Sequence, residues 1–105
     1  MLSVLIVDDD EDLLEMVEMV LENSLIHVKT LNSGSGLLKK IEEERPDVLV
    51  MDIYLGDADG RFLCEQLKNS EDYRDIPVLL YSAGVISLNL LRLPRLTSSY
   101  LNHFK

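Results

Sequence analysis

Carboxylates and one hydroxyl stand at the ends of three apolar runs in this sequence. Asp8 and Asp9 follow LSVLIV, and Asp52 closes VLVMD. Ser82 closes a third run, VLLYS. A carboxylate beside buried apolar residues is costly to desolvate, so we expect each one at a strand end, near water or a cation. These four side chains are therefore candidates for a single site.

The chemistry of such a site follows from its charges. Three carboxylates within a few ångströms repel one another by roughly 1–4 kcal/mol per pair at 4 Å. A hard divalent cation removes this penalty, and Mg²⁺ is often held by one or two carboxylates, waters and phosphate oxygens. A carboxylate is also a nucleophile toward phosphoryl groups, and a nearby hydroxyl can bind a phosphoryl oxygen. The residue types indicate a Mg²⁺-dependent phosphoryl acceptor.

The segments that carry these residues alternate between strand and helix patterns. Short apolar runs predict strands over 2–7, 25–31, 48–53 and 78–82. Helical spacing predicts helices over 11–22, 34–44 and 61–70, the first with Asp10 as its N-cap. The apolar face expected of the first helix contains Leu13, Leu14, Val17, Val20 and Leu21. The alternating order predicts a parallel sheet with helices on both faces, and the carboxyl ends of its strands share one edge.

The composition limits the partners and the compartment. A net charge of -9 argues against binding of nucleic acid or of an anionic membrane, and it is compatible with a cation site or a basic protein partner. Cys64 is the only cysteine, which excludes an internal disulfide and favours a cytoplasmic location; we expect it to be a small buried apolar side chain. The sequence contains no apolar run of about 18 residues, so no membrane span is expected.

Four motifs together resemble the receiver domain of two-component response regulators. They are VDDD, PDVLVMD, DIYLGDADG and PVLLYSA. The match covers residues 2–84 in order and with suitable spacing, within a single domain over 1–105 in which 85–105 form an atypical tail. The resemblance implies an α/β fold, a three-layer doubly wound parallel sheet of the flavodoxin-like (CheY-like) type. Its strand order is 2-1-3-4-5, with the fifth strand and last helix incomplete or missing.

The resemblance also implies a role for each site residue. Asp52 is the phosphoryl acceptor. Ser82 is the switch hydroxyl, the side chain that responds when Asp52 is phosphorylated. Mg²⁺ is bound by Asp52, directly by Asp9, mostly through water by Asp8, and by the backbone carbonyl of Tyr54. The phosphoryl donor is a sensor histidine kinase or a phosphotransfer protein, and output goes to a downstream protein. The domain is not an enzyme beyond self-catalysed phosphotransfer and autodephosphorylation.

The chain departs from the family pattern at the central turn and in the tail. Gly56 replaces the usual proline, which should loosen the turn. A receiver continues past its fourth strand for about 40 residues of helix, strand and helix, whereas 23 residues follow Ser82. We expect a helix over 85–93 and a fifth strand over 99–104. Lys105 is the candidate for the family's lysine, two residues beyond the expected position.

The charge changes sign along the chain. Residues 1–75 contain all 19 acidic residues and seven basic ones, a net -12, whereas residues 76–105 carry +3. If 99–104 do not cover the edge of VLLYS, that edge is a template for pairing with another chain. The apolar, basic tail could then be exchanged with a second copy. The sequence thus predicts a homodimer through 76–105.

Two other functions remain open at this point. A degenerate receiver would act as a constitutive protein-interaction module without phosphorylation-driven switching, because its C-terminal end is defective. A Mg²⁺-dependent phosphatase on a similar sheet would require a second aspartate two residues after the nucleophile, and Tyr54 occupies that position. A third alternative is that the chain is a fragment of a longer regulator.

Overall fold

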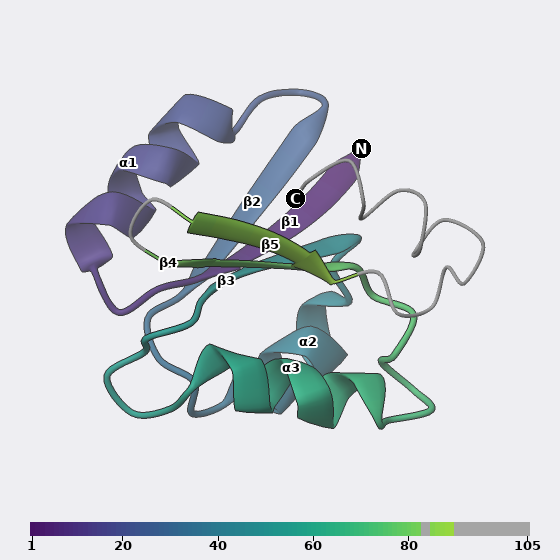
Figure 1. The fold of residues 1–105 in the computed structure, drawn as a ribbon. Helices are drawn as coiled ribbons and strands as arrows, with labels where there is room; N and C mark the ends of the chain where they lie inside the picture. Colours follow the sequence, from purple (N-terminus) through teal and green to yellow (C-terminus); the bar gives the residue numbers. More distant parts are fainter. Residues whose placement is uncertain (83–84, 90–105) are drawn as a thin grey trace.

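Strands and helices alternate along the chain up to the fourth strand, and a fifth strand follows. The computed structural model describes residues 1–82 and 85–89 (Figure 1). The elements are β1 (Leu2–Val7), α1 (Glu11–Leu21), β2 (Ile26–Leu31), α2 (Leu37–Glu44), β3 (Val48–Asp52), α3 (Gly60–Lys68), β4 (Val78–Ser82) and β5 (Val85–Asn89). Among the described residues, no helix is long and apolar enough to cross a membrane.

The sheet has the strand order β2-β1-β3-β4-β5. The first four strands pair in parallel, with Val4 opposite both Val28 and Val48 in the register. The α/β fold and the order of these four strands confirm the sequence-based prediction. Because all four run the same way, their carboxyl ends lie along one edge of the sheet.

The fifth strand corrects the expectation for the start of the tail. Residues 85–89 form β5, antiparallel to β4, with Ser82 opposite Val85, so the helix expected over 85–93 is wrong for them. Only two residues separate β4 from β5, and a parallel neighbour would need a connection of a dozen residues or more. The strand expected over 99–104 and the lysine expected at Lys105 lie outside the described residues.

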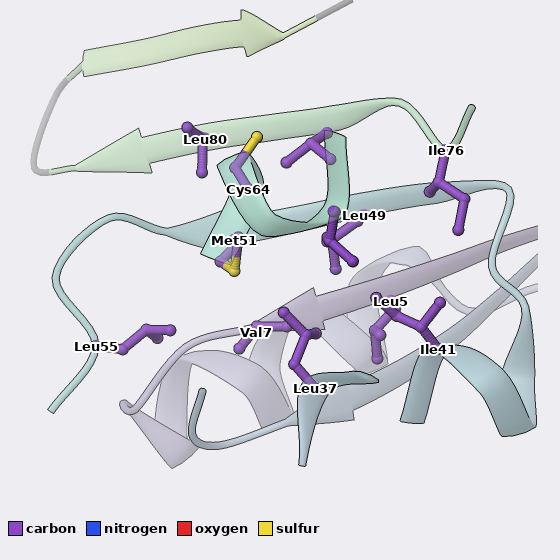
Figure 2. Packing of buried hydrophobic residues seen from close by; sticks show 12 residues of the cluster. Leu5, Val7, Leu37, Ile41, Leu49, Met51, Leu55, Cys64, Ile76 and Leu80 are labelled. Carbon is purple, nitrogen blue, oxygen red and sulfur yellow. The ribbon is translucent and has the colours of Figure 1, made fainter. Parts of the chain in front are cut away.

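The two faces of the sheet are covered unequally. α2 and α3 lie together on one face, and α1 lies on the other (Figure 1). The α2/α3 face buries the larger cluster, in which side chains from β1, β3 and β4 meet those of both helices (Figure 2). Its members are Leu5, Val7, Leu37, Ile41, Leu49, Met51, Leu55, Cys64, Leu67, Ile76, Val78 and Leu80. Cys64 is 1% exposed within it, as expected of a small apolar side chain.

The α1 face buries a smaller cluster. It consists of Val4, Ile6, Leu14 and Val28, with Val17 packed against it. Asp10 caps α1 by accepting hydrogen bonds from the backbone N–H groups of Asp12 and Leu13, as predicted. The predicted apolar face of the helix is only partly correct, because Val20 is 73% exposed. The helix packs on the sheet through Leu14 and Val17, which lie in its first two turns. Val20 lies beyond these turns and is not buried, although it has the helical spacing of an apolar face.

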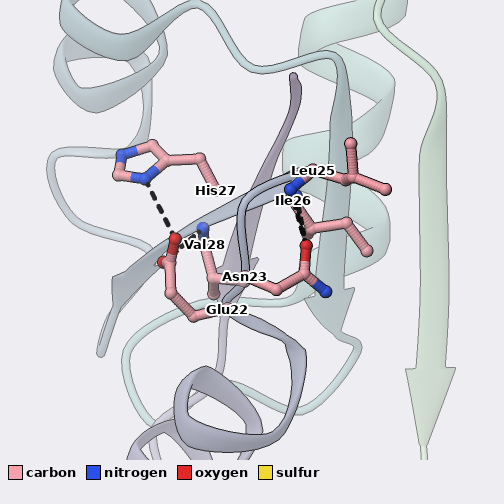
Figure 3. Close-up of polar contacts among 6 residues, drawn as sticks. All are labelled: Glu22, Asn23, Leu25, Ile26, His27 and Val28. Carbon is pink, nitrogen blue, oxygen red and sulfur yellow. Dashed lines mark hydrogen bonds and ion pairs between the residues drawn. The ribbon is translucent and has the colours of Figure 1, made fainter.

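The connection from α1 to β2 covers the outer edge of the sheet (Figure 3). The Glu22 carboxylate accepts a hydrogen bond from the Val28 N–H at 2.9 Å and lies 3.4 Å from the His27 ring nitrogen. The Asn23 side-chain oxygen accepts from the Ile26 N–H at 2.9 Å. Two outward backbone donors of β2 are therefore satisfied by side chains, which protects this edge from pairing with another strand.

Candidate functional site

The site is built from the ends of three neighbouring strands. Asp8 and Asp9 directly follow β1, and Asp52 is the last residue of β3. The three carboxylates each offer an oxygen within 4.8 Å of the others. Ser82, the last residue of β4, lines the same open hollow of about 370 Å³. The structure thus brings together the four side chains that the sequence singled out.

Asp8 is the buried member of the group. Its side chain is 3% exposed, and both of its oxygens accept hydrogen bonds. The Asp10 N–H donates to Oδ1 at 2.8 Å, and the Tyr81 hydroxyl donates to Oδ2. Burial of a charged carboxylate is tolerated when its oxygens have such donors.

Tyr81 is a site residue that the sequence analysis did not identify. It stands opposite Asp52 in the register of β3 and β4, so both belong to the same edge of the sheet. Burial and, next, its bond to the Asp8 carboxylate raise the pKa of the Tyr81 hydroxyl, which keeps it a donor. The available signal was its position: a tyrosine directly before a strand-end serine reaches the strand's carboxyl edge, and buried tyrosine hydroxyls usually find partners.

Asp52 is half-buried and has fewer donors than Asp8. Its Oδ1 accepts a hydrogen bond from the Tyr54 N–H at 3.1 Å. Desolvation raises the pKa of Asp52, the Tyr54 bond opposes that rise, and the negative charges of Asp8 and Asp9 add to it. In the described part of the chain, no lysine or arginine forms an ion pair with any of the three carboxylates. Among the described residues, the negative charge of the three carboxylates is therefore not offset by an ion pair, and such a group suits a divalent cation.

The turn between β3 and α3 is held against the turn between β2 and α2. The Asp57 carboxylate accepts hydrogen bonds from the backbone N–H groups of Gly34 and Ser35, each at 2.8 Å. These two bonds lower the pKa of Asp57. This role of Asp57 has no local signal in the sequence, because its partners are 22 and 23 residues away.

Two glycines in this turn allow close approaches to the site. A Cβ added to Gly60 would collide with the backbone oxygen of Asp52, so only glycine fits where α3 begins. A Cβ on Gly56 would lie 3.3 Å from Oδ2 of Asp9. Gly56 was expected to loosen the turn. The Asp57 hydrogen bonds oppose such loosening, because they tie the same turn to Gly34 and Ser35.

Comparison with known proteins agrees with this geometry. Residues 4–88 match the response regulator receiver domain. The chain is 41% identical over 83 residues to the heme response regulator HssR of Staphylococcus aureus (strain JH9), which covers 79% of this chain and 36% of that protein. This chain belongs to the response regulator receiver domain family of two-component systems. It spans about a third of the length of the curated relatives that it matches.

Solved receiver structures have the same fold. The N-terminal domain of a response regulator receiver protein from Methanoculleus marisnigri JR1 is 31% identical, with a TM-score of 0.69 over 74% of this chain and 63% of that chain. The non-phosphorylated HemR receiver domain from Leptospira biflexa is 29% identical, with a TM-score of 0.70 over 79% of this chain and 65% of that chain. Receiver domains are signalling domains that interact with histidine kinases or phosphotransfer proteins.

Proposed function

We propose that this domain accepts a phosphoryl group on Asp52 from a partner histidine kinase or phosphotransfer protein, with Mg²⁺ as cofactor. The observation that carries the proposal is the placement of Asp52 at the end of the central strand β3, facing two carboxylates and lining a hollow with Ser82. The single cysteine is typical of the reducing cytoplasm, where we place this reaction.

The donor groups fit Mg²⁺. Oxygen ligands are the ones it prefers, and the carboxylates of Asp8, Asp9 and Asp52 supply them within 4.8 Å of one another. The backbone carbonyl of Tyr54 is the further ligand that we assign. Bound at these oxygens, the cation would neutralise the carboxylates and the incoming phosphoryl oxygens. The raised pKa of Asp52 supports this assignment, because its causes include the two negative neighbours that a cation would offset.

The phosphoryl transfer itself needs one nucleophile and one hydrogen-bond donor from this chain. A carboxylate oxygen of Asp52 forms a bond to phosphorus while the bond from phosphorus to the donor's histidine nitrogen breaks. The electron pair of the broken bond stays on that nitrogen. We assign the Ser82 hydroxyl the role of binding a phosphoryl oxygen, because Ser82 lines the hollow next to Asp52.

Intact mass spectrometry tests this proposal. The purified chain is incubated with acetyl phosphate and Mg²⁺, with a matched sample containing excess chelator. We expect a gain of one phosphoryl group in the first sample and none in the second. An unchanged mass in both samples would contradict the proposal.

The structure of the C-terminal end favours one alternative, the degenerate receiver that acts as a constitutive protein-interaction module. β5 follows β4 directly and antiparallel, which departs from the helix expected at that position. In this alternative, phosphorylation would leave partner binding and oligomeric state unchanged. The intact-mass experiment separates the two functions: a gain of one phosphoryl group favours the phosphoryl acceptor, and no gain favours this alternative.

We also propose a homodimer that forms through residues 76–105. The contrast between the two sheet edges supports it: donors of β2 are satisfied by Glu22 and Asn23, whereas β5 is the outermost described strand on the other side. The outermost strand of a sheet presents unpaired backbone groups that can serve as a template for pairing with another chain. Light scattering at micromolar concentration should give about twice the monomer mass of 12.0 kDa. A monomer mass would contradict the dimer and leave the phosphoryl-acceptor proposal intact.

A further inference from the structure

The hydrogen bond between Tyr81 and Asp8 joins two residues of the site that are 73 positions apart. We propose that Tyr81 is a positioning residue whose hydroxyl occupies Oδ2 of Asp8 in the metal-free protein and thereby weakens Mg²⁺ binding. This inference rests on the proposed function, because it concerns the cation that the three carboxylates would hold.

The contacts of Asp8 explain why this hydroxyl matters. Oδ1 is taken by the Asp10 N–H, a backbone donor fixed at the start of α1. Oδ2 is taken by Tyr81, the one side-chain donor to Asp8 among the described residues. Each oxygen of Asp8 already accepts one hydrogen bond, which makes it a weaker ligand for a cation. At Oδ2, Mg²⁺ and the Tyr81 hydroxyl would compete for the negative charge of the same oxygen.

The neighbours of Tyr81 show that the bond is local to the site. Tyr81 lies on β4 opposite Asp52 in the strand register. It lines the same hollow as Asp9 and Ser82. A proton donor inside a group of three carboxylates reduces their repulsion in the absence of a cation. If Mg²⁺ displaces the hydroxyl, the free energy of Mg²⁺ binding is reduced by the stabilisation that Tyr81 gives to the metal-free state.

Tyr81→Phe removes the hydroxyl and keeps the ring. If cation binding breaks the bond, loss of the hydroxyl should tighten Mg²⁺ binding by about tenfold, the effect of one hydrogen bond to a charged group. Isothermal titration calorimetry with MgCl₂ measures this change. The melting temperature supplies a second readout: the variant should melt below wild type in chelator, and the gap should close at saturating Mg²⁺.

Tyr73→Phe is the matched control. Tyr73 packs against the large core cluster and lies under the Arg45 guanidinium, away from the acidic site. A hydroxyl with a purely structural role gives the same melting gap with and without Mg²⁺, which is the result we expect for Tyr73. The same behaviour in Tyr81→Phe, or an unchanged or weaker Mg²⁺ affinity, would overturn the inference.

The experiment also separates this inference from the proposed function. Binding by wild type with no tightening in Tyr81→Phe removes the inference alone. Binding by the variant but not by wild type supports the inference and contradicts Mg²⁺ use by the natural chain. Binding by neither protein overturns both. In an Asp8→Ala background, which removes the acceptor, loss of the Tyr81 hydroxyl should no longer change Mg²⁺ affinity, and a persisting tenfold effect would mean that Tyr81 does not act through Asp8.

Discussion

Aspartates in two neighbouring regions of this domain have opposite electrostatic surroundings. The acidic cluster, Asp8, Asp9 and Asp52, gathers carboxylates within 4.8 Å of one another. The acidic turn, Asp57 and Asp59, faces hydrogen-bond donors instead. Asp57 accepts from the backbone N–H groups of Gly34 and Ser35, and Asp59 accepts from the side chain and backbone N–H of Arg61.

The pKa shifts record this difference. Desolvation raises the pKa of Asp52, with the charges of Asp8 and Asp9 contributing, whereas hydrogen bonds lower the pKa of Asp57 and of Asp59. An aspartate side chain is thus a structural acceptor in the turn, whereas at Asp52 the ionised form is disfavoured. Among the described residues, the hydrogen bonds to the cluster go to Asp8 and Asp52, and a group of carboxylates with so few donors suits a cation. A carboxylate with donors on both oxygens, such as Asp57, anchors a loop.

The largest expected effect separates the two regions by phosphorylation. Asp52→Asn should abolish labelling by acetyl phosphate, because the amide has no anionic oxygen to attack phosphorus. Asp57→Asn is the matched control and should be labelled like wild type, since Asp57 anchors a turn. Intact mass after incubation measures both. Undiminished labelling of Asp52→Asn would place the acceptor elsewhere.

The next effect concerns the cation. Wild type should gain about 2.7 kcal/mol of stability at a Mg²⁺ concentration of about 100 times Kd. Asp9→Asn should lose most of this gain, while its metal-free stability stays equal or rises because one repulsive charge is removed. Chemical denaturation with Mg²⁺ and with chelator gives both values. Equal Mg²⁺ responses in the two proteins would show that Asp9 is not a ligand.

A smaller effect tests the packing beneath the acidic turn. In Gly34→Ala the new Cβ would lie 2.8 Å from the Ala58 Cβ and 2.9 Å from Leu63 Cδ1, so the two turns must separate. We expect a loss of about 1–3 kcal/mol from this overpacking. Ser35→Ala keeps the backbone N–H that Asp57 uses and should stay within about 0.5 kcal/mol of wild type. Urea denaturation compares the two, and equal stabilities would show that the turns tolerate separation.

The smallest effect is in the pH dependence of metal-free stability, where the two regions should differ in sign. The raised pKa of Asp52 means that its ionised form is disfavoured in the folded state. Asp52→Asn should therefore stabilise the protein at neutral pH, by about 1 kcal/mol for relief of carboxylate repulsion. This advantage should shrink as pH falls from the raised pKa toward the ordinary value of 3.8.

Asp57 should behave in the opposite way. Its lowered pKa contributes stability above the ordinary value of 3.8 that is lost as pH falls below it through the folded-state pKa. Asp57→Asn should melt at a lower temperature than wild type at pH 7, with the gap narrowing only below about pH 4. Melting curves in chelator across this range check both variants. A shared sign for the two would contradict the contrast between the cluster and the turn.

Much of the site was predictable because it depends on local pattern. Apolar runs that end in Asp8, Asp52 and Ser82 identify strand ends, and parallel strands bring those ends to one edge. The boundaries of β1 and β4 follow directly from such runs. The N-cap at Asp10 was predictable for the same reason, since its donors lie two and three residues ahead.

The remaining features depended on which distant segments become neighbours. The Tyr81 hydroxyl reaches Asp8 across 73 residues, and Asp57 reaches Gly34 across 23, so neither contact has a periodic signal. The direction of β5 likewise depends on its antiparallel pairing with the edge of β4. This pairing forms a strand over 85–89, where a helix was expected. Sequence alone determined which residues could do chemistry, because residue type and strand position are local properties. Only the tertiary structure decided which of them are anchored and which are left to repel, because hydrogen-bond donors come from wherever the fold places them.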